Sequence, residues 1–222
     1  MLDFRGAVLW DLDGTLVDSE EYHWRAWKET LEGEGISIAY RDFQSSFGQR
    51  NDTILSRWLG SDAGIERIER IGRVKEARYR ELVHREGLAP LPGASEWVER
   101  LHKEGWRQAI ASSAPRANVE AVLEELRFRH FFQATVSAED VQAGKPDPQV
   151  FLTAASRLRA APGECIVVED AAAGVEAARR GGMRSIGVGR KADTLGADLA
   201  ATKLSDLPAD AFVFLLAKQS AK

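Results

Sequence analysis

Two aspartates one residue apart, Asp11 and Asp13, stand where a short apolar run ends. The run from Ala7 to Trp10 predicts a buried strand, and Gly14 after the second aspartate allows a tight turn. Alternate residues of an extended segment point the same way, so both carboxylates can face one pocket. Neighbouring carboxylates in a closed site repel each other strongly unless a positive charge lies beside them. A magnesium site and a capping turn are both compatible with such a pair.

Further polar side chains follow apolar runs in the second half of the chain. Ser112 follows one such run, Glu169 and Asp170 follow another, and Lys145 lies in a loop between them. Because these runs alternate with helical patterns, they predict a parallel sheet with helices on both faces, whose strand ends share one edge. We therefore expect these side chains to meet Asp11 in one pocket.

This set of groups suits phosphoryl transfer to a carboxylate. Magnesium prefers oxygen ligands, so Asp11, Asp170, a backbone carbonyl and a substrate phosphate oxygen would hold it. We expect Asp11 to attack phosphorus and to form an acyl phosphate that water hydrolyses. Asp13 would protonate the departing oxygen and then deprotonate the attacking water. Ser112 and Lys145 would hold the transferring oxygens, although Ser112 alone could also cap the following helix.

The pattern of predicted secondary structure changes near Pro90. Residues 19–87 predict helices only, with Ser19 as the cap of the first helix. Residues 65–86 predict a long amphipathic helix whose charges face solvent. From Pro90 onwards, helices alternate with short apolar strands at 108–111, 134–136, 166–168 and 185–188. The sequence therefore predicts an α/β fold with two domains: a core of residues 1–18 and 88–222, and an all-helical cap of residues 19–87.

The bulk composition excludes several classes of protein. The chain has 222 residues, 44% of them hydrophobic, and a formal net charge of −4, which argues against a nucleic-acid-binding surface. Its single cysteine, Cys165, follows no disulfide or metal-binding pattern and is expected to be buried. No apolar run reaches the length of a membrane span. We expect a monomeric, cytoplasmic protein that acts on a small phosphorylated metabolite.

In order and spacing, four groups of residues resemble the motifs of haloacid dehalogenase superfamily phosphatases that carry a helical cap. The groups are Asp11-Leu12-Asp13-Gly14-Thr15, Ser112, Lys145-Pro146, and Glu169-Asp170 with Gly174 after it. The resemblance implies a Rossmann-like core with the cap inserted after the first strand. It implies Asp11 as nucleophile and Asp13 as acid and base. It also implies Mg²⁺ held by Asp11, the backbone carbonyl of Asp13 and Asp170, with Glu169 assisting.

Within this superfamily, Asp13 argues against dehalogenases, phosphonatases and transport ATPases, which lack the second aspartate. Residues 21–28 are similar to a helix of the β-phosphoglucomutase group, in which a histidine, here His23, is linked to cap closure. Arg50 and Lys75 fall near positions where cap residues of that group contact substrate. The alternatives are helix packing for His23 and exposed charge for Arg50 and Lys75.

The loop after Ser112 departs from the mutase pattern. It reads Ser113-Ala114-Pro115-Arg116, where the mutases carry a serine-lysine-asparagine run for a second phosphate. Ser113 and Arg116 are the candidate substrate contacts in this loop. We therefore expect a magnesium-dependent phosphohydrolase for a small, sugar-like phosphomonoester. A phosphoglucomutase and a non-catalytic sensor that binds a phosphometabolite are the alternatives.

Overall fold

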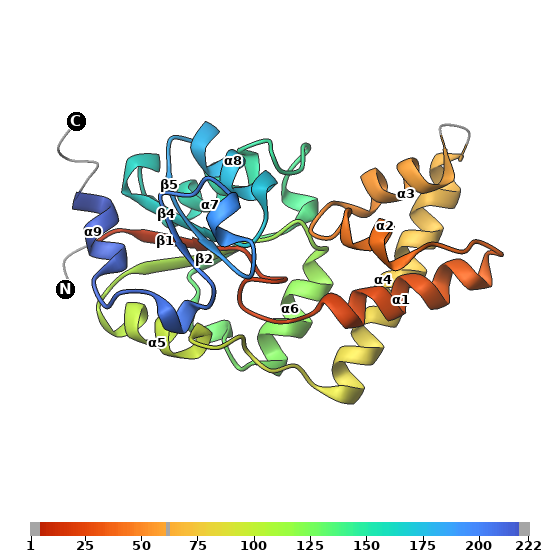
Figure 1. The fold of residues 1–222 in the computed structure, drawn as a ribbon, viewed down its shortest axis with the longest axis horizontal. Helices are drawn as coiled ribbons and strands as arrows, with labels where there is room; N and C mark the ends of the chain where they lie inside the picture. Colours follow the sequence, from red (N-terminus) through yellow and green to blue (C-terminus); the bar gives the residue numbers. More distant parts are fainter. Residues whose placement is uncertain (1–4, 61–62, 218–222) are drawn as a thin grey trace.

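A parallel sheet forms the centre of the molecule. The computed structural model describes residues 5–60 and 63–217. Six strands hydrogen bond in the order β3-β2-β1-β4-β5-β6, and every neighbouring pair is parallel (Figure 1). The strands are β1 (Ala7–Trp10), β2 (Arg107–Ala111), β3 (Ala134–Val136), β4 (Cys165–Glu169), β5 (Arg184–Val188) and β6 (Leu199–Ala201). Because β1 pairs with both β2 and β4, the residues that follow these three strands lie together at one edge.

The five predicted strands are all present, so the predicted parallel α/β architecture is confirmed. The sixth, β6, was not predicted from the sequence. It is a three-residue edge strand of half-buried Leu and Ala residues, and this composition carries little strand propensity. The pairing of β6 with the buried β5 outweighs that weak local preference.

Helices cover both faces of the sheet. Along β1, Val8 and Trp10 belong to one buried cluster and Ala7 and Leu9 to another, as alternation along a strand requires. The first cluster includes side chains of α5 (Ala94–Lys103), α6 (Arg116–Glu125) and α9 (Ala211–Ala217), and the second those of α7 (Gln149–Leu158) and α8 (Ala172–Arg180).

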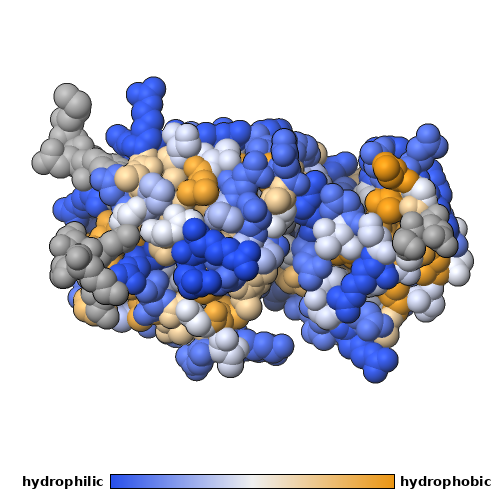
Figure 2. Space-filling model, turned by 90° about the horizontal axis from the view of Figure 1, so that it is seen from above, coloured by the Kyte–Doolittle hydropathy of each residue, from blue (hydrophilic) through white to orange (hydrophobic). Residues whose placement is uncertain are grey.

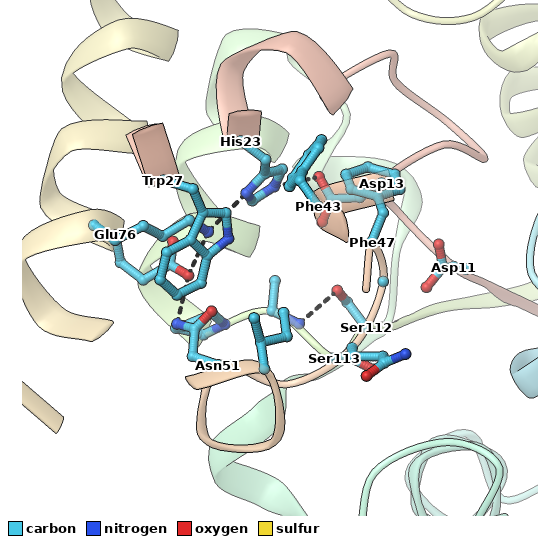
Figure 3. Close-up of a pocket in the computed structure, with 16 residues that line it drawn as sticks. Asp11, Asp13, His23, Trp27, Phe43, Phe47, Asn51, Glu76, Ser112 and Ser113 are labelled. Carbon is cyan, nitrogen blue, oxygen red and sulfur yellow. Dashed lines mark hydrogen bonds and ion pairs between the residues drawn. The ribbon is translucent and has the colours of Figure 1, made fainter. Parts of the chain in front are cut away.

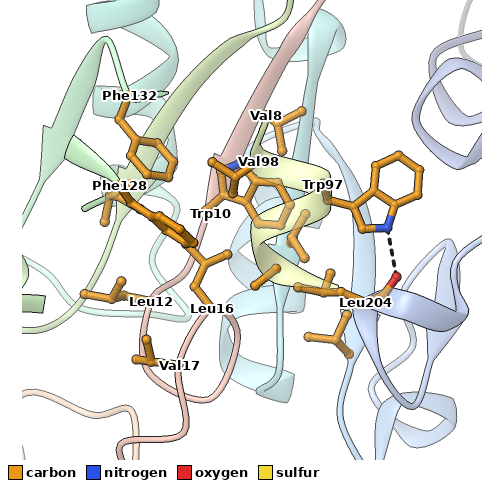
Figure 4. Packing of buried hydrophobic residues seen from close by; sticks show 14 of the residues in the cluster. Val8, Trp10, Leu12, Leu16, Val17, Trp97, Val98, Phe128, Phe132 and Leu204 are labelled. Carbon is orange, nitrogen blue, oxygen red and sulfur yellow. Dashed lines mark hydrogen bonds between the residues drawn. The ribbon is translucent and has the colours of Figure 1, made fainter. Parts of the chain in front are cut away.

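Tryptophans anchor the larger of these clusters (Figure 4). Trp10 is fully buried, and its indole N–H donates to the side-chain oxygen of Gln108 at 2.9 Å. The indole N–H of Trp97 donates to the carbonyl of Leu204 at 2.8 Å (dashed line in Figure 4). Both donors are satisfied inside the core, so the large rings can be buried without an unpaired polar group. This packing holds β1 rigidly behind the aspartates.

Four helices, which we call the cap helices, stand beside the sheet at the right of Figure 1. They are α1 (Glu20–Gly33), α2 (Tyr40–Gln44), α3 (Asn51–Leu59) and α4 (Ile65–Glu86). No strand interrupts them within 20–60 and 63–86, as predicted. They share a separate apolar cluster that includes Trp27, Phe43 and Leu55, while the later turns of α4 pack against the core. The division into two domains at these boundaries stays a prediction.

The molecular surface narrows between the cap helices and the sheet (Figure 2). Most of the surface in this view is hydrophilic, with small hydrophobic patches on both parts. Within the described residues, no helix combines the length and the apolar character that crossing a bilayer requires. Cys165 is buried, as predicted, and is a free thiol.

Two local predictions were wrong. Ser19 precedes α1 but its side chain does not cap that helix; its hydroxyl donates instead to Asp13 Oδ1 at 2.5 Å. The charges of α4 do not all face solvent either, because Lys75 and Glu76 are buried, with 2% and 6% of their surfaces exposed. In both cases the polar group turns inward toward a partner, which a helical periodicity alone does not predict.

Candidate active site

Lys145 joins two carboxylates at the edge of the sheet. Its ammonium lies 2.5 Å from Asp11 Oδ1 and 2.6 Å from Glu169 Oε1, and all three side chains are almost fully buried. Asp11 follows β1, Glu169 ends β4, and Lys145 lies in the loop before α7. Three separate segments therefore meet in one ion cluster, as the parallel sheet predicts. Burial lowers the pKa of Lys145, but the two carboxylates raise it by more, so the lysine stays charged.

The cluster carries an excess of negative charge. Carboxylate oxygens of Asp11, Glu169 and Asp170 lie within 4.8 Å of one another, and Lys145 supplies a single positive charge. Burial raises the pKa of Asp11 to about 7, against the lowering by Lys145. Burial and the two neighbouring carboxylates raise the pKa of Asp170 well above its ordinary value. A divalent cation would offset this excess, and hard oxygen donors are what Mg²⁺ prefers, so the residues present fit this ion.

Two glycines allow this close approach. Gly14 has a φ of +86°, and a Cβ placed on it would lie 2.2 Å from Asp170 Oδ2. A Cβ on Gly174, in the first turn of α8, would lie 1.9 Å from Glu169 Oε1. Both distances are far below any real contact, so neither position can hold a side chain without moving a carboxylate. The glycines of the first and last motifs therefore shape the acidic cluster.

Asp13 has different surroundings from Asp11. Its Oδ1 accepts a hydrogen bond from the hydroxyl of Ser19 and lies 3.3 Å from His23 Nε2. The ring of His23 stacks on Tyr79, with centroids 4.0 Å apart. Burial raises the pKa of Asp13, but His23 and Ser19 lower it by more, and the net pKa lies below its ordinary value. The two aspartates thus occupy separate environments within one pocket.

The pocket itself lies between the sheet edge and the cap helices (Figure 3). Asp11, Asp13, Ser112 and Ser113 line it from the sheet side. Ser112 is 2% exposed, and its Oγ accepts a hydrogen bond from the backbone N–H of Ala114 at 3.0 Å. The cap side contributes His23, Trp27, Phe43, Phe47, Gly48, Gln49, Asn51, Ile54, Lys75 and Glu76. A small molecule held here would have acids and hydroxyls on one side and aromatic rings on the other.

Only some of the predicted cap residues line the pocket. Lys75 lines the pocket, where its ammonium lies 2.8 Å from His23 Nδ1 and 2.8 Å from Glu76 Oε1. Arg50 does not line it; its guanidinium donates to the carbonyls of Ala138 and Val141 in the core. The structure therefore brings His23 and Lys75 to the site and places Arg50 at a contact between cap and core.

Of the two predicted substrate contacts in the loop after Ser112, one lines the pocket and the other does not. Ser113 lines the pocket. Arg116 does not, because its guanidinium lies 2.8 Å from Asp140 Oδ1 and is half exposed. Pro115 precedes the first residue of α6, so Arg116 starts the helix, and its side chain pairs with Asp140.

Sequence reasoning missed Glu76 and the residues that hydrogen bond to it. Asn51 donates to Glu76 Oε1 at 2.7 Å, and Asn118 of α6 donates to Glu76 Oε2. Arg80 in turn donates to Asn118 Oδ1 at 2.9 Å. Glu76 follows Lys75 in a strongly charged helix, so its type and spacing carried no signal that it is buried. Trp27 is both buried and pocket-lining.

Comparisons with known proteins place this arrangement in a family. Residues 6–182 match the haloacid dehalogenase-like hydrolases. The chain is 34% identical over 218 residues to β-phosphoglucomutase of Bacillus subtilis, which covers 90% of this chain and 91% of that protein. It is 35% identical over 183 residues to hexitol phosphatase B of Escherichia coli, with coverage of 81% and 82%.

Solved structures agree with this assignment. The crystal structure of β-phosphoglucomutase from Clostridium difficile matches with a TM-score of 0.88 at 25% identity, over 98% of this chain and 99% of that one. The predicted resemblance, drawn from the motifs around Asp11, Ser112, Lys145 and Glu169, is thereby confirmed. This chain belongs to the family of haloacid dehalogenase-like hydrolases.

Proposed function

We propose that this protein is a magnesium-dependent phosphohydrolase that cleaves a small, sugar-like phosphomonoester through an aspartyl-phosphate on Asp11. The observation that carries the proposal is the different environment of the two aspartates in one pocket. Asp11 lies in the acidic cluster beside Lys145, and Asp13 lies against His23 and Ser19. One carboxylate is thus placed for attack and metal binding, and the other for proton transfer.

Each side chain then has a defined role. Asp11 attacks phosphorus with its free carboxylate oxygen, while Lys145 and Ser112 hold the equatorial oxygens of the phosphoryl group. Asp13 donates a proton to the departing sugar oxygen, and it later takes a proton from the water that attacks the acyl phosphate. Asp11 and Asp170, with the Asp13 carbonyl and with Glu169 assisting, would hold Mg²⁺, which supplies charge neutralisation at the phosphoryl oxygens.

The polarity of the pocket favours water over a second phosphate ester as the acceptor. Among the lysines and arginines in the described part of the chain, Lys75 is the one that lines this pocket, and Glu76 neutralises it. A mutase must also hold the second phosphate of a bisphosphate intermediate, and Arg116, the candidate for that task, pairs with Asp140 instead. A phosphate at the far end of a substrate would therefore find no unpaired lysine or arginine among the described residues that line this pocket.

The relatives carry names of both kinds. The Bacillus subtilis protein is a β-phosphoglucomutase and the Escherichia coli protein a hexitol phosphatase, at nearly equal identity. Both names refer to phosphorylated sugars or sugar alcohols, which supports a substrate of that class. They do not separate hydrolysis from phosphoryl transfer, so the pocket residues carry that part of the proposal.

The deciding experiment follows both reactions in one assay. Purified protein with Mg²⁺ is given β-glucose 1-phosphate, and glucose 6-phosphate and inorganic phosphate are measured together. Phosphate release is then measured on a panel of hexose, pentose and hexitol phosphates. We expect phosphate release to exceed isomerisation. Isomerisation that outpaces phosphate release would favour the mutase, and no reaction with any ester would favour a non-catalytic sensor.

A further inference from the structure

We infer that Glu76 and Asn51 form a specificity-determining pair, which binds hydroxyl groups of an uncharged polyol and repels leaving groups that carry a second negative charge. This inference rests on the proposed hydrolysis of a phosphomonoester. It concerns the end of the substrate that leaves, whereas the motifs around Asp11 concern the end that reacts.

The position of the pair fits this role. In Figure 3, Glu76 and Asn51 lie at the side of the pocket opposite Asp11, Ser112 and Ser113. Both residues line the pocket, and Glu76 is 6% exposed. A phosphoryl group held at Asp11 would direct the rest of a small substrate toward this wall. The groups on the wall therefore meet the part of the substrate farthest from the reaction.

The charge of the wall disfavours an anionic leaving group. Lys75 is the lysine that lines this pocket, and its ammonium is already shared between Glu76 Oε1 and His23 Nδ1, each at 2.8 Å. A second phosphate or a carboxylate placed here would compete with the buried carboxylate of Glu76 for the same ammonium. Two anions in a closed, poorly solvated pocket repel strongly, so such a ligand is bound weakly.

Hydrogen-bonding capacity remains for a neutral ligand. An ionised carboxylate accepts about four hydrogen bonds, and Glu76 receives donors from Lys75 and Asn51 on one oxygen and from Asn118 on the other. Asn51 uses one amide N–H in its bond to Glu76. Its second N–H and its carbonyl oxygen can thus serve a ligand. A hydroxyl group both donates and accepts, so it matches this mixed pair better than an anion, which only accepts.

The pair is held rigidly by the core. Asn118, which is 1% exposed on α6, donates to Glu76 and accepts from Arg80 at 2.9 Å. α6 follows the loop that carries Ser112 and Ser113, so the hydroxyl-binding wall is fixed relative to the phosphoryl-binding side. Trp27 and Phe43 also line the pocket and offer apolar surface to the C–H groups of a sugar or sugar alcohol.

The test compares two ligands that differ at one end. Glucitol 6-phosphate ends in a hydroxymethyl group, and 6-phosphogluconate ends in a carboxylate at the same position. Their dissociation constants are measured by calorimetry with Mg²⁺ in an Asp11→Asn background, so that binding does not depend on turnover. We expect at least a tenfold preference for the neutral ligand. Adding Glu76→Gln, which removes the charge and frees Lys75, should shift the ratio of the two constants at least tenfold toward 6-phosphogluconate.

A second variant and a control guard against a folding defect. Asn51→Ala should weaken the binding of glucitol 6-phosphate several-fold without changing the affinity for inorganic phosphate. Glu66 is an exposed charge on the same helix as Glu76, and Glu66→Gln should leave the ratio of the two dissociation constants unchanged. Equal affinity of the Asp11→Asn protein for glucitol 6-phosphate and 6-phosphogluconate would overturn the inference. So would an unchanged ratio of the two dissociation constants in Glu76→Gln together with unchanged binding of glucitol 6-phosphate in Asn51→Ala. Absence of phosphate release by the unaltered protein, with the binding preference intact, would instead refute the proposed hydrolysis.

Discussion

The Nε2 atom of His23 lies 3.3 Å from Oδ1 of Asp13, so the first cap helix touches the carboxylate that we assign to proton transfer. The other ring nitrogen of His23 lies 2.8 Å from the ammonium of Lys75 on α4. Two cap helices are thereby connected to the segment that follows β1. The pKa of Asp13 depends on residues of the cap helices, which contain none of the four sequence motifs.

Replacing His23 should change the pH profile as well as the rate. Burial raises the pKa of Asp13 and His23 counteracts it, so His23→Ala should move the pKa of Asp13 upward. The acidic limb of the kcat profile should then shift to higher pH, because Asp13 must be ionised to accept a proton from water. We expect kcat/KM to fall roughly 10- to 100-fold. His84→Ala, on an exposed part of α4, should leave both unchanged. An unaltered profile in His23→Ala would contradict the assigned contact.

The acidic cluster predicts how metal and pH act on stability. Burial raises the pKa of Asp11 from 3.8 to about 7, so the folded state binds this proton more tightly than the unfolded state. The stability from that proton is fully present below the unfolded pKa and is lost as pH rises through about 7. The Tm of the metal-free protein should fall over this range. Mg²⁺ should therefore raise the Tm more at about pH 8 than at about pH 5.5, as scanning fluorimetry can measure.

Asp11→Asn separates the chemistry from the fold. The amide cannot attack phosphorus, so we expect phosphate release to drop by at least about 1,000-fold. The same change removes one of three crowded carboxylates. The metal-free variant should thus lose much of the pH dependence of its Tm and should match or exceed the parent at high pH. Asp18→Asn, at an exposed site, serves as the control. Retained phosphate release in Asp11→Asn would exclude Asp11 as the nucleophile.

Lys145 should matter for stability as well as for catalysis. Removal of one partner from a buried ion pair costs about 3 to 5 kcal/mol, because the remaining charge is left without compensation. In Lys145→Met, Asp11 and Glu169 would face each other without a cation, so the free energy of unfolding in urea should fall by this order. The loss should shrink as pH falls and the carboxylates take up protons. Lys103→Met removes an exposed ion pair with Glu99 and should cost less than about 1 kcal/mol. Similar losses in both variants would refute the buried cluster.

The sheet side of the pocket was largely predictable because most of its polar residues lie at the carboxyl ends of strands. Asp11, Ser112 and Glu169 come directly after apolar runs, and a parallel sheet brings such ends to one edge whatever the length of chain between them. Lys145 was predictable from its loop, through the motif around Pro146. Five of the six strands could likewise be predicted from buried apolar runs.

Glu76 and its hydrogen-bond partners were not predictable from local sequence, whereas Lys75 was named only through the family resemblance. Glu76 and Lys75 are adjacent charges in a helix with many charges, and a helical pattern does not say which of them turns toward another helix. Asn51 and Asn118 join them only through tertiary packing between α3, α4 and α6. Arg116 shows the converse error, since its place in the loop after Ser112 suggested a ligand contact, but Asp140 holds its guanidinium. Contacts between separate helices decide these positions, and local sequence does not encode them.

Two glycines in helices provide a matched test of the site geometry. Gly174 lies in α8, where a Cβ would stand 1.9 Å from Glu169 Oε1, and Gly72 lies in α4, where the nearest atom to a Cβ is 3.7 Å away. Helix propensity alone predicts that alanine at either position raises the free energy of unfolding by about 0.5 to 1 kcal/mol. We expect this gain for Gly72→Ala. Gly174→Ala should instead lower stability and reduce phosphate release, because Glu169 must move and Lys145 moves with it. The free energy of unfolding in urea and the rate of phosphate release are measured for both variants. A Gly174→Ala variant that is stabilised and fully active would show that Glu169 does not hold Lys145 in place.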